Sequence, residues 1–253
     1  KLPMATIANA TQPGQIALRT DIWTASRGFG RAMTHAGRQY AHELGVLAEM
    51  SLRGLQQELA GFPAGSRAMQ GALYTFNLIE RWDRIVGANA GKVWADKVGR
   101  RLRDPSPRRQ AWLQRELERL TFSRDEISEI LTRGAWRSPD DVNRVAWAIT
   151  DQTQFLSRRP RRSEFFNTPT GALLGQFKTF ATNTGRLMNQ MVIREARHGN
   201  FGPAARVVVL FPILGEAAAD VRALLTGRER PDSLAARLLE NFFFVGGLGL
   251  ATD

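Results

Sequence analysis

Signals that start and stop helices recur along almost the whole chain, and they constrain its fold more than any other feature. Residues 123–126, SRDE, form a capping box, and Gly134 is suited to end the helix that follows. Ser138 precedes Pro139 as an N-cap before a proline at the first helical position. No segment shows the alternation of apolar and polar residues that marks a half-buried strand. The sequence therefore predicts an all-α protein, arranged as an extended multi-helix assembly.

The spacing of apolar residues between these signals gives the expected helices. We expect about seven or eight, over 20–60, 63–103, 108–121, 123–134, 138–156, 169–198 and 202–226, with a last one beginning near 231. Residues 1–19 are small and polar and contain two prolines, so they are predicted to form an extended N-terminal arm. Glycines in the first of the helices weaken it and would allow a break near residues 28–30.

The segment 202–226 is the most apolar of the expected helices. At about 20 residues, it approaches the length that spans a membrane. Arg206, Glu216 and Asp220 argue against a simple spanning helix, so we expect a buried core helix. Pro212 should kink it.

Two proline-containing linkers suggest a division into three parts. DPSP at 104–107 and RRPRR at 158–162 interrupt the helical pattern. The expected parts are listed in chain order: an N-terminal arm with long helices at 1–104, a connector of short helices with basic loops at 105–162, and a long amphipathic helix with apolar C-terminal helices at 163–253. The chain begins with Lys1 and ends in an apolar run, so we expect it to be a piece of a longer protein.

The chain is strongly basic, and the excess is nearly all arginine. The formal net charge is +11, and 4 of the 35 basic residues are lysine, which leaves 31 arginines. A GC-rich genome can produce a bias toward arginine, but it does not explain the sign of the net charge. A charge of this size favours nucleic acid, anionic lipid or acidic protein partners.

Two arginine clusters beside the prolines are the candidate contacts with a polyanion. The first comprises Arg100, Arg101, Arg103, Arg108 and Arg109, and the second comprises Arg158, Arg159, Arg161 and Arg162. Guanidinium groups bind phosphate and carboxylate in a bidentate manner, and phosphate contacts of this kind do not depend on base sequence. The alternatives are a solvated loop or an interface with acidic patches of neighbouring subunits.

The expected helix 169–198 combines an apolar seam with a basic face. The seam has steps of three and four residues and comprises Leu173, Phe177, Phe180, Leu187 and Met191, with Thr184 between the last phenylalanine and Leu187. Such a seam predicts helix packing or an oligomer interface, although it is shorter than a coiled coil requires. Lys178 and Arg186 lie away from the seam and are further candidates for contact with nucleic acid or an acidic partner.

The sequence contains no recognisable catalytic or metal-binding motif. It has no cysteine, which excludes disulfides and cysteine-based metal sites. His35 and His42 are seven residues apart and lack the HExxH spacing of a zinc helix. The pair Glu116 and Glu118 fits a charged helix face better than a general acid in a glycosidase site. We therefore expect no catalytic residue, no metal and no cofactor, and a protein that is not an enzyme.

The stretch 158–198 resembles a region of internal virion proteins of short-tailed bacteriophages and of related large polyvalent phage proteins. The likeness rests on Asn167, Pro169 and Gly171, followed by QFKTF at 176–180 and an asparagine at 183. The helix–glycine–helix unit 123–156 is similar to the region that precedes this motif in the family. The likeness covers about 110–253, and the motif itself is short.

The resemblance implies a structural virion protein that helps to form the conduit for genome ejection across the host envelope. Its expected partners are further copies of the same chain in a ring or tube, the portal and other ejection proteins, phage double-stranded DNA bound non-specifically, and the host inner membrane. The expected location is the virion interior and, after ejection, the host periplasm and inner membrane. From the residues alone, two other functions stay open: a helical nucleic-acid-binding module, and a membrane-active effector whose last helices insert.

Overall fold

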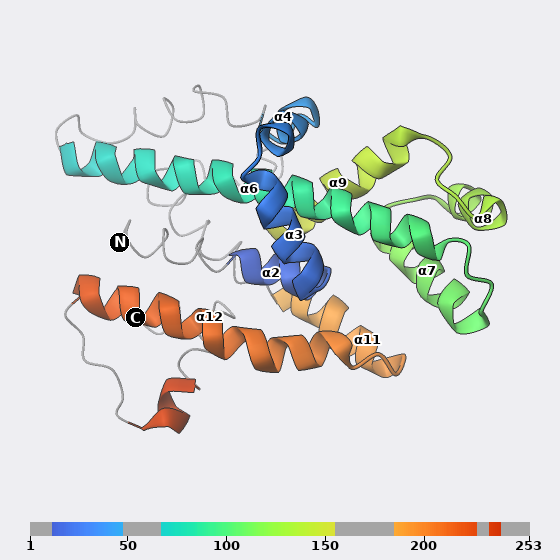
Figure 1. The fold of residues 1–253 in the computed structure, drawn as a ribbon. Helices are drawn as coiled ribbons and strands as arrows, with labels where there is room; N and C mark the ends of the chain where they lie inside the picture. Colours follow the sequence, from blue (N-terminus) through green and yellow to red (C-terminus); the bar gives the residue numbers. More distant parts are fainter. Residues whose placement is uncertain (1–11, 48–66, 155–184, 227–232, 239–253) are drawn as a thin grey trace, which may run out of the picture.

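The computed structural model describes residues 12–47, 67–154, 185–226 and 233–238, and these form helices joined by short connections (Figure 1). No strand occurs within these ranges. The all-α prediction is therefore confirmed. The motif at 164–180 that carries the family likeness lies outside the described residues.

The first described segment forms three short helices: α2 (Gln12–Arg19), α3 (Ile22–Ala32) and α4 (His35–Glu43). Residues 12–19 were expected in the extended arm, and this part of the prediction is wrong because α2 buries Ile16 and Leu18 at 1% exposure each. That burial outweighs the poor helix propensity of the proline and glycine at the start of α2.

The helix expected over 20–60 is divided in the structure. It breaks after α3, where the Thr34 hydroxyl accepts a hydrogen bond from the Gly37 N–H at 3.0 Å and so caps a new helix, α4. Asp21 caps α3 in the same manner, accepting from the Thr24 N–H at 2.9 Å. The break therefore lies beyond residues 28–30, at the next residue able to act as an N-cap.

The helix α6 (Arg67–Arg101) is the spine of the described structure, and its bounds agree with the expected helix 63–103. It packs against α3 and against α9 (Pro139–Gln154) (Figure 1). A Cβ atom on Gly91 would lie 2.6 Å from the Ala146 Cα of α9, and one on Gly28 of α3 would lie 2.5 Å from the Ala90 Cα. These glycines let the helix backbones touch.

The helices α7 (Pro107–Arg119) and α8 (Arg124–Arg133) follow, and both begin where the sequence predicts. Both hydrogen bonds of the capping box join Ser123 and Glu126, and Gly134 ends α8 with φ 63°. One hydrophobic core links these helices to α6 and α9, and it draws side chains from both sides of position 104. It includes Trp94, Val98, Leu102, Leu113, Leu117, Leu120, Ile127, Ile130, Val145 and Ile149.

Residues 185–226 form the C-terminal hairpin. Its first arm is helical from 185, with a π-helical stretch η3 (Asn189–Ile193) and a final turn α11 (Arg194–Arg197), and it ends at Gly199, where φ is 75°. Its second arm is α12 (Gly202–Thr226). A short helical stretch at 234–238 follows.

In the part of α12 whose side chains are described, up to Glu216, one side is buried and the other is exposed. Val207 and Phe211 are buried, whereas Val208 and Ile213 are 69% and 62% exposed. The prediction of a buried core helix is therefore wrong for the side that carries Val208 and Ile213, because α12 packs on α2 and η3 through its other side. Among the described residues, no helix combines the length and the apolar character needed to cross a membrane.

A buried polar network joins the C-terminal hairpin to the remaining helices. Glu116 of α7 is 1% exposed and accepts hydrogen bonds from Arg19 at 2.8 Å and from the Trp94 indole at 2.7 Å. On the next turn of α7, Arg119 forms an ion pair with Glu195 of α11, which is also 1% exposed. The network thus passes from α2 through α7 to the hairpin.

Candidate functional site

The turn between α6 and α7 carries the first arginine cluster. Arg100 and Arg101 lie in the last turn of α6, and Arg108 and Arg109 lie in the first turn of α7. Asp104 accepts a hydrogen bond from the Ser106 N–H at 3.0 Å, which tightens the turn and brings the two helix ends together. We call Arg100, Arg101, Arg103, Arg108 and Arg109 the basic surface.

Arg108 and Arg109 lie in the first turn of α7, where basic side chains do not stabilise a helix. The partial positive charge at a helix N-terminus is stabilised by acidic side chains, yet the first turn of α7 has none and contains Arg108 and Arg109. Ser106 also provides no side-chain capping bond. The first turn of α7 therefore carries cations and backbone amides without an intrahelical partner, and both favour an anion.

Arg101 lies at the centre of the basic surface. Its guanidinium stacks over the Trp112 ring, 5.1 Å from the ring centroid. Burial lowers the pKa of Arg101 below its ordinary value, and the positive charges of Arg109 and Arg100 lower it further. Arg100 and Arg109 are therefore each close enough to Arg101 to repel its positive charge.

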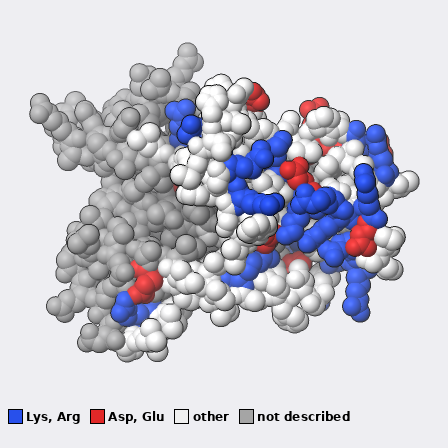
Figure 2. Space-filling model, viewed as in Figure 1, with Lys and Arg blue, Asp and Glu red and all other residues white. Residues whose placement is uncertain are grey.

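Few acidic groups compensate the basic surface. Asp104 pairs with Arg109 at 3.5 Å, but both side chains are more than a third exposed, and pairs of this kind contribute little. Arg100, Arg103 and Arg108 are exposed and form no ion pair with any described residue. Arg103 lies beside Gly134, at the end of α8. Figure 2 shows Lys and Arg side chains gathered over the α3, α6 and α7 side of the molecule.

Sequence reasoning missed an exposed aromatic group next to the basic surface. Trp23 of α3 is 63% exposed, and the Arg27 guanidinium lies 4.9 Å from its ring centroid. The start of α3 meets the end of α6 through the ion pair of Asp21 with Lys97, at 2.6 Å. The i,i+4 spacing of tryptophan and arginine could have indicated this pair, but exposure could not be read from the sequence.

The remaining predicted residues fall in two groups. Arg158, Arg159, Arg161, Arg162, Lys178, Leu173, Phe177 and Phe180 lie outside the described residues. Arg186 is exposed on the C-terminal hairpin, whereas Leu187 and Met191 are buried within the chain against Leu18, Val207 and Phe211.

The basic surface is suited to bind phosphate groups rather than to catalyse a reaction. Guanidinium groups and backbone amides recognise phosphate oxygens without reading base sequence. Neighbouring tryptophans provide apolar faces on which arginines are held in position. No three His, Asp or Glu side chains of the described residues come together in a way that could hold a metal ion.

Comparisons of the chain with protein families, with curated proteins and with solved structures found no match.

Proposed function

We propose that this chain is a structural segment of a phage internal virion protein that contacts double-stranded DNA through its basic surface. In this proposal the protein is stored inside the virion with portal and ejection proteins as neighbours. It then assembles as a ring or tube across the host periplasm and at the inner membrane. The family likeness of residues 110–253 supports the virion role, and the basic surface supports the DNA contact.

The observation that carries the DNA contact is the crowding of cations at one helix turn. Among the described residues, Asp104 is the carboxylate that forms an ion pair with one of the five arginines, and two of these arginines start a helix that gains nothing from them. Each arginine that neutralises a phosphate displaces a cation condensed on the DNA, and the release of these cations favours binding at low salt. The contact is non-specific, because the arginines contact the phosphate backbone and do not contact the base edges.

The DNA contact is tested by measuring binding to two short duplexes of unrelated sequence over a range of salt concentrations. We expect equal affinities for both duplexes and a linear fall of log K with log salt. The slope should decrease by about 1 for each of Arg100→Ala and Arg108→Ala. Arg38→Ala is the matched control. Arg38 is an exposed arginine on α4, so its substitution removes the same charge at a position away from the basic surface.

Two results would contradict this contact. One is an absence of binding at low salt. The other is an equal change of slope in Arg38→Ala and Arg108→Ala, because the slope would then depend on the net charge of the protein and not on the basic surface. A preference for one duplex would contradict the non-specific mode.

Assembly is examined on the same protein by negative-stain electron microscopy and by sedimentation. Rings or tubes are expected for the virion role. A protein that binds DNA as proposed but stays monomeric at every concentration and on DNA would instead support a helical nucleic-acid-binding module. The basic surface favours that second candidate equally, and only assembly separates the two.

A further inference from the structure

The helix α3 has its small residues inside and its large apolar residues outside. Thr24, Gly28 and Ala32 follow one another at steps of four residues, and all three are buried. A Cβ atom on Gly28 would lie 2.5 Å from the Ala90 Cα of α6, so this side of α3 has no room for a large side chain. The large apolar side chains lie on the outward side, where α3 crosses in front of α6 in Figure 1.

The outward side of α3 carries an apolar stripe. Ile22, Phe29 and Met33, the last at the C-cap, are seven and four residues apart and therefore share one face of the helix. Their exposed fractions lie between 44% and 61%. The Phe29 ring meets the Trp82 ring edge-on, with 5.7 Å between the centroids, which holds it at the surface.

Trp23 separates this stripe from a row of cations. Arg27 and Arg31 follow Trp23 at steps of four residues, and both are exposed and form no ion pair with any described residue. The Arg27 guanidinium lies 4.9 Å from the Trp23 ring centroid. An indole between apolar groups and cations is typical of a membrane–water interface. We call this set the α3 surface; it comprises Ile22, Trp23, Arg27, Phe29, Arg31 and Met33.

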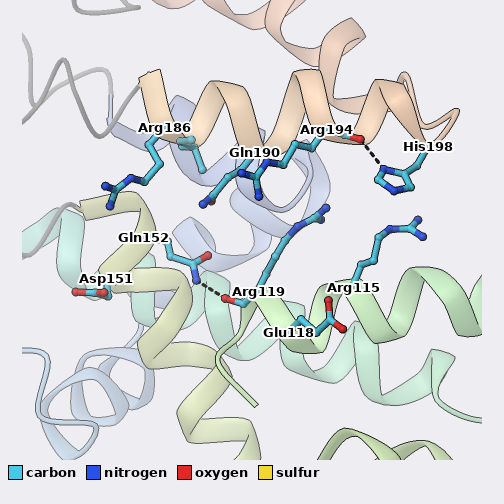
Figure 3. Close-up of a pocket in the computed structure, with 10 residues that line it drawn as sticks. Arg115, Glu118, Arg119, Asp151, Gln152, Arg186, Gln190, Arg194 and His198 are labelled. Atoms are coloured by element: carbon cyan, nitrogen blue, oxygen red, sulfur yellow. Dashed lines mark hydrogen bonds between the residues drawn. The ribbon is translucent and has the colours of Figure 1, made fainter. Parts of the chain in front are cut away.

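The charge of the α3 surface has one sign. The helix contains no Asp or Glu, and the carboxylate of its N-cap, Asp21, is paired with Lys97 at 2.6 Å. The cavity between α7, α9 and the C-terminal hairpin differs in this respect, because the carboxylates of Glu118 and Asp151 line it together with arginines (Figure 3). The α3 surface is therefore suited to an anionic partner that also offers an apolar phase.

We infer that the α3 surface docks on the headgroups of an anionic phospholipid bilayer. The apolar stripe and Trp23 enter the boundary between headgroups and acyl chains, while Arg27 and Arg31 stay at the lipid phosphates. In this mode α3 lies on the bilayer and does not cross it. Among the described residues no helix is suited to cross a membrane, which agrees with this mode.

Two other partners fit the α3 surface less well. Nucleic acid would use the cations and the Trp23 ring, because bases stack on aromatic rings, but it would leave the aliphatic side chains of Ile22 and Met33 in water. A second copy of the chain in a symmetric contact would bring its own Arg27 and Arg31 to the same surface, where like charges repel. A lipid surface accommodates both the apolar stripe and the cations.

The proposed function brings the protein to the host inner membrane, and the inference rests on that proposal for its setting. It adds which surface meets the lipid and which headgroup charge is selected. The DNA contact uses the basic surface and not the α3 surface, so the two can fail separately.

The test is flotation of the full chain with vesicles of phosphatidylcholine and phosphatidylglycerol, compared with vesicles of phosphatidylcholine alone. We expect binding to the mixed vesicles that weakens at high salt, and much weaker binding to phosphatidylcholine alone. Trp23→Ser and Met33→Ser should each weaken binding about tenfold, because one apolar side chain no longer enters the lipid. Both side chains are more than half exposed, so the variants are expected to fold.

Matched controls separate the α3 surface from general properties of the chain. Val208→Ser removes an apolar side chain that is 69% exposed on α12, and it should leave vesicle binding unchanged. Arg31→Ala should weaken binding about fivefold, as expected for the loss of one cation near an anionic surface. Arg124→Ala removes the same charge at an exposed position of α8 and should change binding by less than about twofold.

Vesicles with brominated acyl chains locate the Trp23 ring. Bromine quenches the fluorescence of an indole that enters the bilayer, and the other tryptophans are buried or half-buried. Trp23→Phe keeps a large apolar ring, so it should retain most of the binding while it loses the quenching. Quenching that persists in Trp23→Phe would mean that another part of the chain enters the lipid, and the inference would fail.

The inference is overturned if the mixed vesicles are not bound at low salt, or if phosphatidylcholine alone is bound equally well. It is also overturned if Val208→Ser weakens binding as much as Met33→Ser does. Loss of DNA binding in Trp23→Ser with unchanged vesicle binding would assign the surface to nucleic acid, and loss of self-association alone would assign it to a second copy. Vesicle binding that depends on Trp23 in a protein that fails to bind DNA would support the α3 surface and contradict only the DNA contact.

Discussion

The contact between α6 and α9 and the joint between α7 and the C-terminal hairpin are built by opposite means. At the first, Gly91 sits against the Ala146 backbone, and the surrounding side chains are small and buried. At the second, Arg119 of α7 pairs with Glu195 of α11, and the neighbouring buried pair Arg19 and Glu116 ties α7 to α2, on which α12 packs. The first contact depends on shape, and the second depends on charge.

This difference determines which conditions each contact tolerates. Close packing of helix backbones is insensitive to pH and salt but is intolerant of added atoms. Buried ion pairs tolerate changes of shape better, but they fail when one partner is removed or protonated. Protonation or removal of one ionic partner should therefore loosen the hairpin, whereas the α6–α9 contact should be weakened by added side-chain atoms.

The largest expected effect is at the buried pair. Glu116→Ala should lower the free energy of unfolding by about 3–5 kcal/mol, because it leaves the Arg19 charge buried without its carboxylate. Urea unfolding followed by circular dichroism measures the change. Glu118→Ala, on the same helix but exposed, is the matched control and should change stability by less than about 0.5 kcal/mol.

A double variant refines this prediction. Replacing Arg19 and Glu116 together by leucine removes both charges, so it should recover much of the loss. If the single variant costs no more than Glu118→Ala does, the joint is not held by charge, and the comparison with the α6–α9 contact fails.

An intermediate effect is expected at the close contact. Gly91→Ala should lower the free energy of unfolding by about 1–3 kcal/mol, because its Cβ would lie 2.6 Å from the Ala146 Cα. Gly30→Ala is the control, since Gly30 lies in helix α3 and nothing lies within 4 Å of its added Cβ. That change should stabilise by about 0.5–1 kcal/mol through helix propensity. The midpoint temperature of thermal unfolding should therefore fall in Gly91→Ala and rise in Gly30→Ala. Shifts of the same sign would argue against a backbone contact at Gly91.

The helices were largely predictable because their signals are local. The capping box at Ser123, the proline at the start of α9 and the glycine that ends α8 each act within one helical turn. The errors concern burial. Residues 12–19 were assigned to an arm because only contact with other helices makes α2 stable, and the exposed side of α12 depends on which neighbours cover it.

The candidate sites divide in the same way. The arginines around position 104 are neighbours in sequence, so their clustering could be predicted. The stacking of Arg101 on Trp112 required the angle between α6 and α7, which the sequence does not specify. The joint between α7 and the C-terminal hairpin could not be predicted, because Arg119 and Glu195 are 76 residues apart and meet only through helix packing.

The smallest expected effect concerns pH at the joint. Burial raises the pKa of Glu195, but hydrogen bonds from Arg119 and Asn200 more than offset it, so the pKa lies below the ordinary 4.5. The unfolded chain thus takes up the proton first as pH falls. The stabilisation is complete above about pH 4.5 and is lost as the pH falls through the lowered folded-state value.

The loss should be on the order of 1 kcal/mol and should affect the joint, because the Glu195 carboxylate accepts hydrogen bonds from Arg119 of α7 and from Asn200 in the turn after α11. Hydrogen exchange at pH 7 and near pH 3 measures it, with amides of η3 and α11 expected to lose protection before those of α6 around Gly91. Carboxylates elsewhere also titrate, since hydrogen bonding to the Ser123 N–H is the main cause that lowers the pKa of Glu126 to about 2. Glu195→Gln separates the two sources: it should remove the pH dependence of the hairpin and leave that of α8 unchanged. Equal loss of protection in α6 and α11 on acidification would mean that the two contacts share one cooperative unit.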